Sequence, residues 1–139
     1  MLPDNPTMDE LEEFFNADRF ATQAAGCRIV EGSRGHGVAE MDLADVHKNA
    51  QGNVMGGAIF TLADFALAIA SNVGQHPTVN AASSIQYLAA TRGTKLIATA
   101  DCVKDGHRLA FYEVDIVDDE GVDIARMSVT GYRHVPRSV

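Results

Sequence analysis

One acidic side chain stands alone in a long apolar segment of the sequence. Asp64 is the only charged residue between Lys48 and Arg92. Burying an unpaired carboxylate is costly, so a sequence that keeps one usually has a use for it. A carboxylate that faces an apolar cleft can act as a general base or as a nucleophile. The alternative is a structural Asp64 that points at a protein interface and accepts hydrogen bonds from backbone N–H groups.

A glycine-containing loop leads into this apolar segment. The loop contains Asn49 and ends in Met55, Gly56 and Gly57. Glycine lets the backbone approach a ligand closely, and the first N–H groups of a helix have no partner within it. Such donors, aided by the helix dipole, suit an oxyanion that forms on a carbonyl group, and the Asn49 amide would add another donor. A tight turn is the plain alternative for the Gly-Gly pair. Combined with an acid two turns later, the pattern indicates acyl transfer to water.

The elements that would position these residues predict an α+β domain. Ala and Leu favour helix, and residues 57–73 are apolar on nearly every face, which indicates a helix surrounded by protein. Thr7 and Glu10 form a capping-box pattern that predicts a first helix over about 8–17, resuming near 19–24. Strands are predicted at 27–31, 36–43, 79–88, 94–104, 108–117 and 122–135, with a loop over 44–56. Short glycine-containing connections indicate antiparallel hairpins, so the sheet is expected to curl around the apolar helix.

The composition excludes several classes of function. The chain has 139 residues, which is the size of a single domain over 1–139, and its net charge of −8 argues against nucleic acid as a partner. The apolar segment is short for a membrane span and has a charge at its centre. Cys27 and Cys102 lie far apart, which indicates reduced thiols, and with no signal-peptide pattern we expect a cytoplasmic protein. The histidines show no metal-ligand spacing, so neither a metal nor another cofactor is expected.

The loop and helix together resemble the signature of a known family. The residues are His47, Asn49, Gly52, Met55, Gly56 and Gly57, followed by Phe60-Thr61-Leu62-Ala63-Asp64. This pattern resembles the PaaI-like (phenylacetate-pathway) branch of the hotdog-fold thioesterases, and the likeness extends from about residue 20 to 135. It includes the hairpin Val103–Phe111. The resemblance implies a hotdog fold, in which an antiparallel sheet wraps around one long central helix, and hydrolysis of an acyl-CoA thioester without a cofactor.

The resemblance also implies a composite catalytic site. Relatives form homodimers by joining two sheets edge to edge, and many pair further into a dimer of dimers. In such a dimer Asn49 and Gly56 of one protomer face Asp64 of the other. Gly56 N–H would be the principal oxyanion donor, the Asn49 amide would assist it, and Asp64 would be general base or nucleophile. Gly57 would also contact the substrate.

Further substrate contacts are expected on the strands. A polar residue on the strand after the central helix helps relatives to hold the water, and Asn80 is the candidate here, with Ser83 and Ser84 as alternatives. The phosphates of coenzyme A need basic partners. The candidates are Lys104, His107 and Arg108 on a hairpin, followed by Arg92 and Lys95. An apolar tunnel beside the helix, lined by residues such as Phe60, Phe65 or Leu88, is expected to hold the acyl group.

One residue departs from the family pattern. Met55 stands where the family usually has His immediately before the Gly-Gly pair. Two functions therefore stay open: an acyl-CoA thioesterase with altered activity, and a non-catalytic acyl-CoA-binding or regulatory hotdog protein. A hotdog dehydratase or hydratase is disfavoured, because that chemistry normally pairs an acid with a His and no His lies on the central helix.

Overall fold

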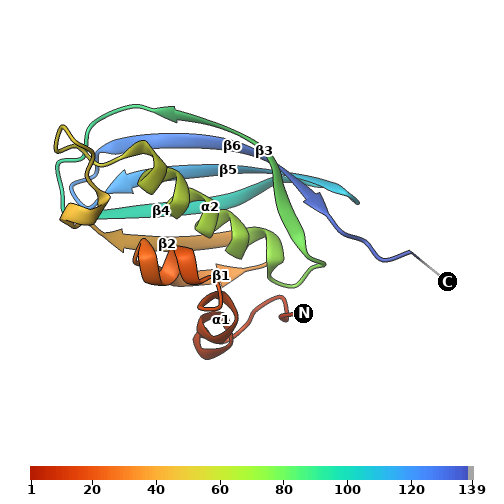
Figure 1. The fold of residues 1–139 in the computed structure, drawn as a ribbon. Coiled ribbons are helices and arrows are strands. Elements are labelled where there is room, and N and C mark those ends of the chain that lie inside the picture. Colours follow the sequence, from red (N-terminus) through yellow and green to blue (C-terminus); the bar gives the residue numbers. More distant parts are fainter. Residues whose placement is uncertain (138–139) are drawn as a thin grey trace.

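The computed structural model describes residues 1–137, in which an antiparallel sheet wraps around one central helix (Figure 1). Helix α2 (Gly56–Asn72) lies along the concave face of the sheet. The strand order is β1-β2-β4-β5-β6-β3, so β1 and β3 are the two edges. All neighbouring strands pair antiparallel. This arrangement confirms the predicted α+β fold.

The observed elements agree with the predicted ones to within a few residues. They are α1 (Met8–Phe15), the π-helical turn η1 (Phe20–Ala24), β1 (Cys27–Ser33), β2 (His36–Asp42), the 3-10 turn η2 (Asp45–His47), α2, β3 (Thr78–Tyr87), β4 (Lys95–Asp105), β5 (Leu109–Asp118) and β6 (Asp123–Arg133). The predicted capping box is present, with the Thr7 and Glu10 side chains each accepting the other's backbone N–H. The predicted helical resumption near 19–24 is present as the short π-helical turn η1.

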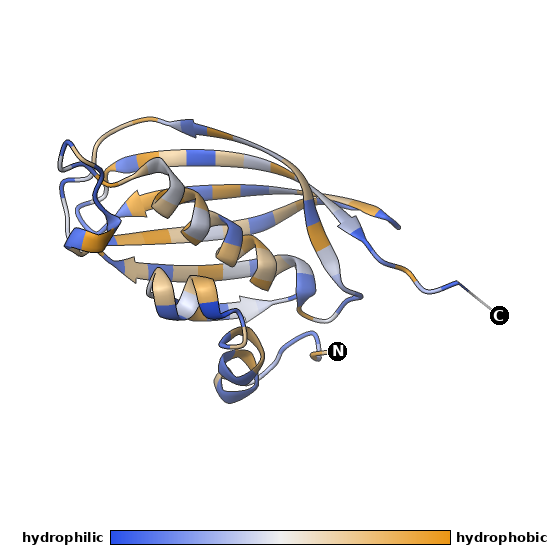
Figure 2. Ribbon diagram, in the orientation of Figure 1, coloured by the Kyte–Doolittle hydropathy of each residue, from blue (hydrophilic) through white to orange (hydrophobic). Residues whose placement is uncertain are grey.

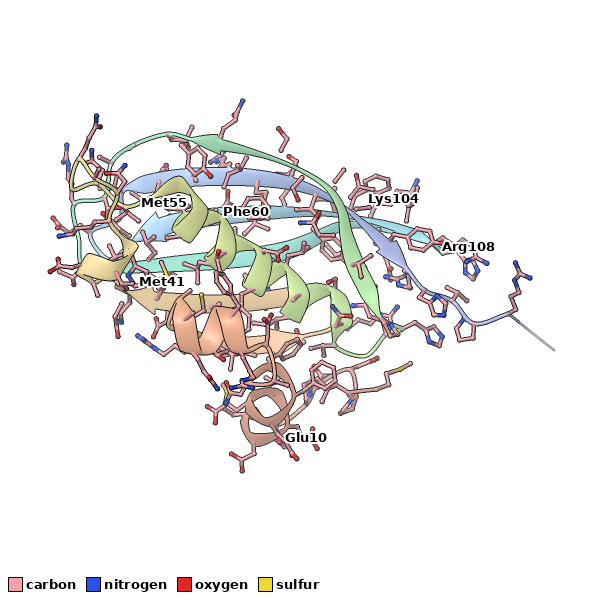
Figure 3. The ribbon with its side chains drawn as sticks, viewed as in Figure 1. Glu10, Met41, Met55, Phe60, Lys104 and Arg108 are labelled. Carbon is pink, nitrogen blue, oxygen red and sulfur yellow. The ribbon has the colours of Figure 1, made fainter. Side chains whose placement is uncertain are left out.

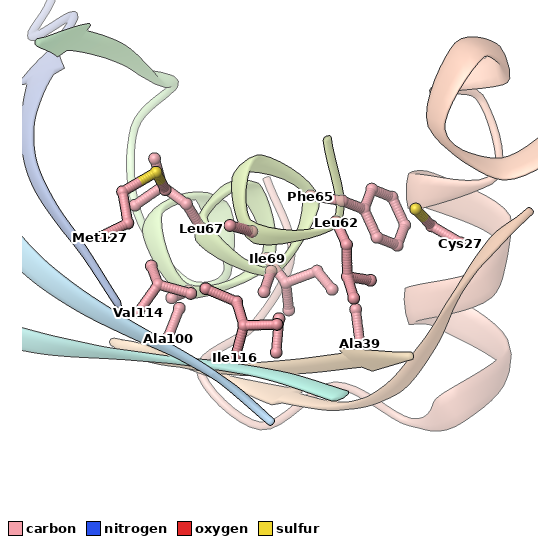
Figure 4. Packing of buried hydrophobic residues seen from close by; sticks show 14 of the residues in the cluster. Cys27, Ala39, Leu62, Phe65, Leu67, Ile69, Ala100, Val114, Ile116 and Met127 are labelled. Carbon is pink, nitrogen blue, oxygen red and sulfur yellow. The ribbon is translucent and has the colours of Figure 1, made fainter. Parts of the chain in front are cut away.

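The core lies between α2 and the concave face of the sheet. Hydrophobic and polar residues alternate along the strands (Figure 2). In β5 the inward residues are buried, among them Val114 and Ile116. Leu62 and Ile69 of α2 pack against this face (Figure 4). Each fully buried aliphatic side chain of this kind contributes about 1.5–3 kcal/mol to folding, so this interface fixes α2 on the sheet.

A glycine allows the close approach of helix and sheet. A Cβ atom at Gly37 of β2 would lie 2.7 Å from the Ala66 carbonyl oxygen and 2.8 Å from the Ile69 Cβ atom. The backbones therefore meet with no room for a side chain. The sheet buries this side of α2, whereas Thr61, Asp64 and Ala68 on its other side stay only half-buried in the single chain.

The C-terminal end of α2 fixes the start of β3. The Asn72 Oδ1 atom accepts the Thr78 N–H at 2.8 Å, and the Asn72 amide donates to the Thr78 carbonyl oxygen at 3.2 Å. From there β3 runs back as the edge strand beside β6. A bulge between Asn80 and Ala82 shifts the register of this pair. Asn80 and Ser83 consequently both pair with inward positions of β6, so their side chains share the face that points toward α2.

Candidate functional site

Asp64 lies in the middle of α2, half-buried on the side that the sheet does not cover. The Asn80 Nδ2 amide donates to Asp64 Oδ1 at 3.1 Å. The Ser83 hydroxyl donates to Asn80 Oδ1 at 2.7 Å, which orients that amide toward the acid. No other donor from residues 1–137 reaches the Asp64 carboxylate. The group is thus held by one amide and keeps most of its lone pairs for water or a substrate.

The structure separates the three candidate residues on β3. Asn80 contacts Asp64 directly, and Ser83 contacts it through Asn80. Ser84 pairs with the exposed Ser128 and therefore lies on the outer face of the sheet. The alternative that Ser84 helps to hold the water is wrong, because consecutive residues of a strand point to opposite faces.

The N-terminus of α2 presents two backbone donors. Met55 is the N-cap residue, its side chain caps no N–H group, and its own N–H donates to the His47 carbonyl oxygen at 2.8 Å. Neither Gly56 N–H nor Gly57 N–H has an acceptor in the described part of the chain. The Tyr87 hydroxyl donates to the Gly56 carbonyl oxygen at 2.9 Å and fixes this first peptide of the helix. The two N–H groups lie at the positive end of the helix dipole, where they can bind an oxyanion.

Asn49 braces the loop that precedes these donors. Its Oδ1 atom accepts the N–H groups of Gln51 at 3.0 Å and Asn53 at 3.1 Å. Gly52 in the same turn has a φ of +84°, which favours glycine. The Asn49 Nδ2 amide has no acceptor among residues 1–137, so it can still donate to a ligand.

His47 anchors the other end of this loop. Its Nδ1 atom accepts the Ala44 N–H at 3.0 Å, so its Nε2 atom donates to the Ala25 carbonyl oxygen at 2.6 Å. The ring is buried. With both nitrogens engaged, His47 holds the loop against η1 and has no free atom for proton transfer.

The two halves of the predicted site are far apart within one chain. Gly56 and Asp64 are eight residues apart in α2. At a rise of about 1.5 Å per residue, this spacing separates them by about 12 Å along the helix axis. A single thioester carbon cannot contact both groups of the same chain. The structure of the protomer therefore brings Asn80 and Ser83 to Asp64 but leaves Asn49, Gly56 and Gly57 at the helix end.

An apolar cavity of about 470 Å³ opens beside the N-terminus of α2. Its lining comes from η1, η2 and the start of α2, namely Phe20, Ala24, Ala25, Val46, His47, Met55, Gly57, Ala58 and Thr61. Phe60, Phe65 and Leu88, which were predicted to line an acyl tunnel, do not line this cavity. Phe65 is instead a core residue, packed edge-on against Phe15 at a centroid distance of 6.3 Å.

The basic candidates fall into two groups at opposite ends of β4. Lys104, His107 and Arg108 are exposed at the hairpin between β4 and β5. Figure 3 shows Lys104 and Arg108 at the end of the molecule opposite Met55. His107 also lines a second cavity of about 310 Å³, together with Arg34, His76 and Arg133.

The other basic group lies near the start of β4. Lys95 is the first residue of the strand, and its Nζ atom lies 3.7 Å from Glu40. Arg92 lies in the loop before it, where its N–H donates to Asp118. Both residues therefore have a partner within the fold: Asp118 for the Arg92 backbone and Glu40 for the Lys95 side chain.

Two residues near the site had no role in the sequence-based prediction. Tyr87 holds Gly56, and the Thr61 hydroxyl donates to the Gly57 carbonyl oxygen at 2.8 Å. Strand alternation predicts that Tyr87 shares a face with Ser83 and Ile85. Because of the bulge after Asn80, alternation does not predict that Asn80 lies on the same face. Thr61 is part of the signature before Asp64, but the signature predicts no hydrogen bond for its hydroxyl.

This architecture, a six-stranded antiparallel sheet around one central helix, is that of the hotdog fold. The model of the thioesterase superfamily matches residues 51–125, and the chain belongs to this superfamily. The predicted enzyme class, a thioesterase, is thereby confirmed. The match covers the end of the loop, α2, β3, β4, β5 and the start of β6.

Individual relatives agree with this assignment. The chain is 37% identical over 107 residues to an Archaeoglobus fulgidus protein named "Putative esterase", covering 76% of this chain and 70% of that protein. The E. coli PaaI protein from the phenylacetic acid degradation operon has the same fold, with a TM-score of 0.84 at 24% identity over 92% of this chain and 94% of PaaI. A Streptococcus pneumoniae hypothetical thioesterase, solved with coenzyme A, has a TM-score of 0.80 at 26% identity over 91% and 99% of the two chains.

Two further findings concern other classes of site. Across residues 1–137, no helix has both the length and the apolar character needed to cross a membrane. The same residues contain no group of three or more His, Cys, Asp or Glu side chains that could hold a metal ion. The cytoplasmic location stays a prediction.

Proposed function

We propose that this thioesterase hydrolyses an acyl-CoA to the free acid and coenzyme A, with Asp64 as its essential acidic group. The carboxylate of Asp64, held by Asn80 on the open side of α2, is the observation that carries the proposal. Coenzyme A in the S. pneumoniae structure supports the substrate class. The confirmed family supports the reaction.

The site is completed by a second copy of the chain. Asp64 and Gly56 of one protomer lie about 12 Å apart along the helix, whereas one carbonyl group needs both within contact distance. Strand β3 is an edge of the sheet and can pair with its own copy across a two-fold axis. Such pairing is antiparallel, so the Tyr87 end of one β3 lies beside the Thr78 end of the other. Since Tyr87 contacts Gly56 and Asn80 contacts Asp64, the partner's Gly56 comes close to Asp64.

In this composite site the thioester oxygen accepts hydrogen bonds from Gly56 N–H and the Asn49 amide of the partner subunit. As general base, Asp64 takes a proton from a water molecule that attacks the carbonyl carbon. The C–S bond then breaks, and the thiolate of coenzyme A takes up the proton as it leaves. As nucleophile, Asp64 would attack the carbon itself and water would hydrolyse the resulting anhydride. Both routes use the same geometry.

The position of the basic hairpin supports a role for it in binding the phosphates of coenzyme A. Thr78 pairs with Arg133, and the Arg133 N–H donates to the Arg108 carbonyl oxygen. The hairpin is thus close to the end of β3 that meets the partner's Gly56. Lys104, His107 and Arg108 would contact the nucleotide there. Further pairing of dimers into tetramers stays a prediction.

Release of free thiol from a panel of acyl-CoAs tests the reaction. We expect steady turnover by the wild-type protein. Tight binding of acyl-CoA by calorimetry without thiol release would contradict this proposal. That result would favour a non-catalytic protein that binds acyl-CoA. This second function is considered because Met55 stands where the family usually has His.

Mixed dimers test the composite site. Asp64→Asn and Asn49→Ala are each expected to be nearly inactive alone. A heterodimer of the two has one site in which both residues are wild-type. Random mixing makes half of the dimers mixed, so about one quarter of the wild-type activity should return. If mass spectrometry detects the heterodimers and no activity returns, the two residues do not act across the interface.

A further inference from the structure

Arg133, the last residue of β6, carries a buried charge. Its side chain is only 8% exposed. Taking a guanidinium group out of water is costly, so such a group is kept where fixed acceptors surround it. The surrounding groups come from three separate parts of the fold: the β4–β5 hairpin, the segment after α2 and, through Asp105, the turn between β1 and β2. Arg133 therefore lies where these parts meet.

Three hydrogen bonds of Arg133 hold the hairpin between β4 and β5. Its Nη2 atom donates to Asp105 Oδ1 at 2.7 Å, and its Nη1 atom donates to the Gly106 carbonyl oxygen at 2.7 Å. Its main-chain N–H donates to the Arg108 carbonyl oxygen at 2.6 Å. These bonds are spread over the turn from which the exposed basic side chains of the hairpin project. The backbone that carries those side chains is therefore fixed from behind.

A further hydrogen bond joins the hairpin to the end of α2. Arg133 Nη2 also donates to Gln75 Oε1 at 2.6 Å. The Gln75 amide donates in turn to the carbonyl oxygens of Ala70 and Val73, at 2.9 and 3.2 Å, at the C-terminus of the helix. Gln75 is itself buried, so this chain of hydrogen bonds is shielded from water. The position of the hairpin is thereby tied to the helix that carries Asp64.

Arg34 binds the same acid of the hairpin from another direction. Its Nη2 atom donates to Asp105 Oδ2 at 3.1 Å, and its Nη1 atom donates to the Gly74 carbonyl oxygen. Desolvation alone would raise the pKa of Asp105, but the hydrogen bonds from Arg133 and Arg34 lower it below its ordinary value. Each carboxylate oxygen of Asp105 thus receives one guanidinium group. Asp105 connects the hairpin to both arginines.

We infer that Arg133 and Asp105 are positioning residues, which fix the hairpin so that its basic side chains meet the phosphates of coenzyme A. This inference rests on the proposed function, because it takes Lys104, His107 and Arg108 as the phosphate contacts. A turn that is already fixed loses less conformational entropy when its side chains bind a ligand. Arg133 and Asp105 therefore increase the affinity for the nucleotide part of the substrate.

Their place in the fold separates this role from the chemical step. Helix α2 ends at Asn72, eight residues after Asp64, which is about 12 Å along the helix axis. Arg133 lies beyond that end, against Gln75. Neither its guanidinium group nor Asp105 reaches a thioester that is bound at Asp64. Substitutions at the two positions should therefore change KM for acyl-CoA more than kcat.

Two carriers of the same acyl group test this role. Acyl-CoA has the nucleotide phosphates and acyl-pantetheine lacks them, whereas the thioester is the same in both. The measured quantity is the ratio of kcat/KM for acyl-CoA over acyl-pantetheine, from thiol release with the acyl group that gives the fastest turnover. For the wild-type protein this ratio should be at least about 10, because only acyl-CoA gains charge-assisted hydrogen bonds from the hairpin. A ratio near one would overturn the inference.

Two variants weaken the attachment of the hairpin. Arg133→Lys should lower the ratio by about tenfold, since an ammonium group keeps the charge but cannot bond Asp105, Gly106 and Gln75 at once. Arg34→Gln, at a half-exposed position, removes the other ion pair of Asp105 and should lower the ratio by about threefold. A merely structural role would change both kcat/KM values together and leave the ratio at its wild-type value.

Two further variants serve as controls. Arg28 also bridges two carboxylates, those of Glu40 and Asp42, but it lies near the opposite end of β4. Arg28→Lys should therefore leave the ratio unchanged. Lys104→Ala removes a direct phosphate contact and should lower the ratio as Arg133→Lys does.

The outcomes separate this inference from the proposed function. If Lys104→Ala lowers the ratio while Arg133→Lys and Arg34→Gln do not, the inference is wrong and the proposed function stands. If the wild-type protein releases no thiol, the proposed function fails, and the ratio of the dissociation constants of pantetheine and coenzyme A is measured by calorimetry instead. A lower ratio in Arg133→Lys then supports the inference, and an unchanged ratio refutes it. Melting curves show whether each variant is folded, and Arg34→Gln decides the question if Arg133→Lys is not.

Discussion

Two aspartates have very different surroundings: Asp64 lies in the middle of α2, and Asp118 lies at the turn between β5 and β6. Asp118 is 2% exposed at the end of β5. Both of its oxygens accept backbone N–H groups, which come from Arg92, Gly93, Glu120 and Val122 at 2.8–3.0 Å. Burial alone would raise the pKa of Asp118, but these four donors hold it at about 2. The charge is satisfied, and it joins the turn to the loop before β4.

Asp64 is more accessible than Asp118 and has far fewer partners. Within residues 1–137 it accepts one hydrogen bond, from the Asn80 amide at 3.1 Å. A carboxylate whose lone pairs are filled by fixed donors contributes to stability, whereas one with open lone pairs can act on a ligand. The number of hydrogen-bond donors therefore distinguishes the fixed carboxylate of Asp118 from the open carboxylate of Asp64 better than burial does. Substitutions at the two acids should therefore have opposite effects.

The largest expected effect is the loss of turnover in Asp64→Asn. The amide cannot take a proton from water or attack a carbonyl carbon, so kcat should fall by about 10²–10⁴-fold. The measurement is thiol release at saturating acyl-CoA. The dissociation constant for acyl-CoA and the melting temperature should change little, since Asn keeps the size of the side chain. Near-normal kcat in this variant would remove Asp64 from the chemistry.

Asp118→Ala should show the reverse pattern. Four backbone N–H groups lose their acceptor, so the free energy of unfolding should fall by about 3 kcal/mol, while kcat of the folded protein at low temperature stays the same. Denaturant unfolding and thiol release measure the two quantities. A loss of kcat without a loss of stability would show that the β5–β6 turn participates in the reaction.

The lowered pKa of Asp118 predicts that the stability of the protein depends on pH. The pKa of Asp118 is about 2 in the folded protein and 3.8 as its ordinary value. A lowered folded-state pKa stabilises the protein above the ordinary value, and this contribution is lost as the pH falls from 3.8 toward 2. The wild-type protein should therefore lose more stability on acidification from about pH 5 to pH 3 than Asp118→Ala does. Equal losses would mean that Asp118 titrates normally in the fold.

A smaller effect is expected when the single partner of Asp64 is removed. Asn80→Ala should lower kcat by about tenfold, because Asp64 loses the amide that orients it. Ser83→Ala, one step further away, should have a smaller effect. Ser84→Ala is the control on the opposite face of β3 and should behave like the wild-type protein. Equal effects at Ser83 and Ser84 would argue against the network.

The smallest expected effect is at the other end of α2. Tyr87→Phe removes the hydrogen bond to the Gly56 carbonyl oxygen and leaves the ring in place. One such bond contributes about 1 kcal/mol, so kcat should fall by about three- to fivefold if Tyr87 positions the Gly56 peptide. The affinity for acyl-CoA should fall less than kcat does, because the oxyanion interaction strengthens in the transition state. An unchanged kcat would leave Tyr87 with a packing role only.

The sequence by itself determined the features that arise from local chemistry. Residues 57–73 are apolar on nearly every face, and a helix without a polar face has to be covered by other parts of the protein. This pattern determined that α2 lies at the centre of the fold. Short glycine-containing connections determined the hairpins around Gly106 and Gly121. Asp64 could be singled out because no other charge is near it in the chain, and the free N–H groups at Gly56 and Gly57 follow from the start of a helix.

Only the tertiary structure decided which side chains meet. The bulge after Asn80 turned Ser83 toward α2 and Ser84 away from it, and strand periodicity cannot reveal such a shift in advance. Phe65 and Asp64 are neighbours in the sequence, yet one is a core residue and the other lies on the open side of the helix. The apolar cavity joins η1 to η2 and α2, which lie much further along the chain. Such contacts depend on how the elements pack in space, and a local pattern carries no record of that packing.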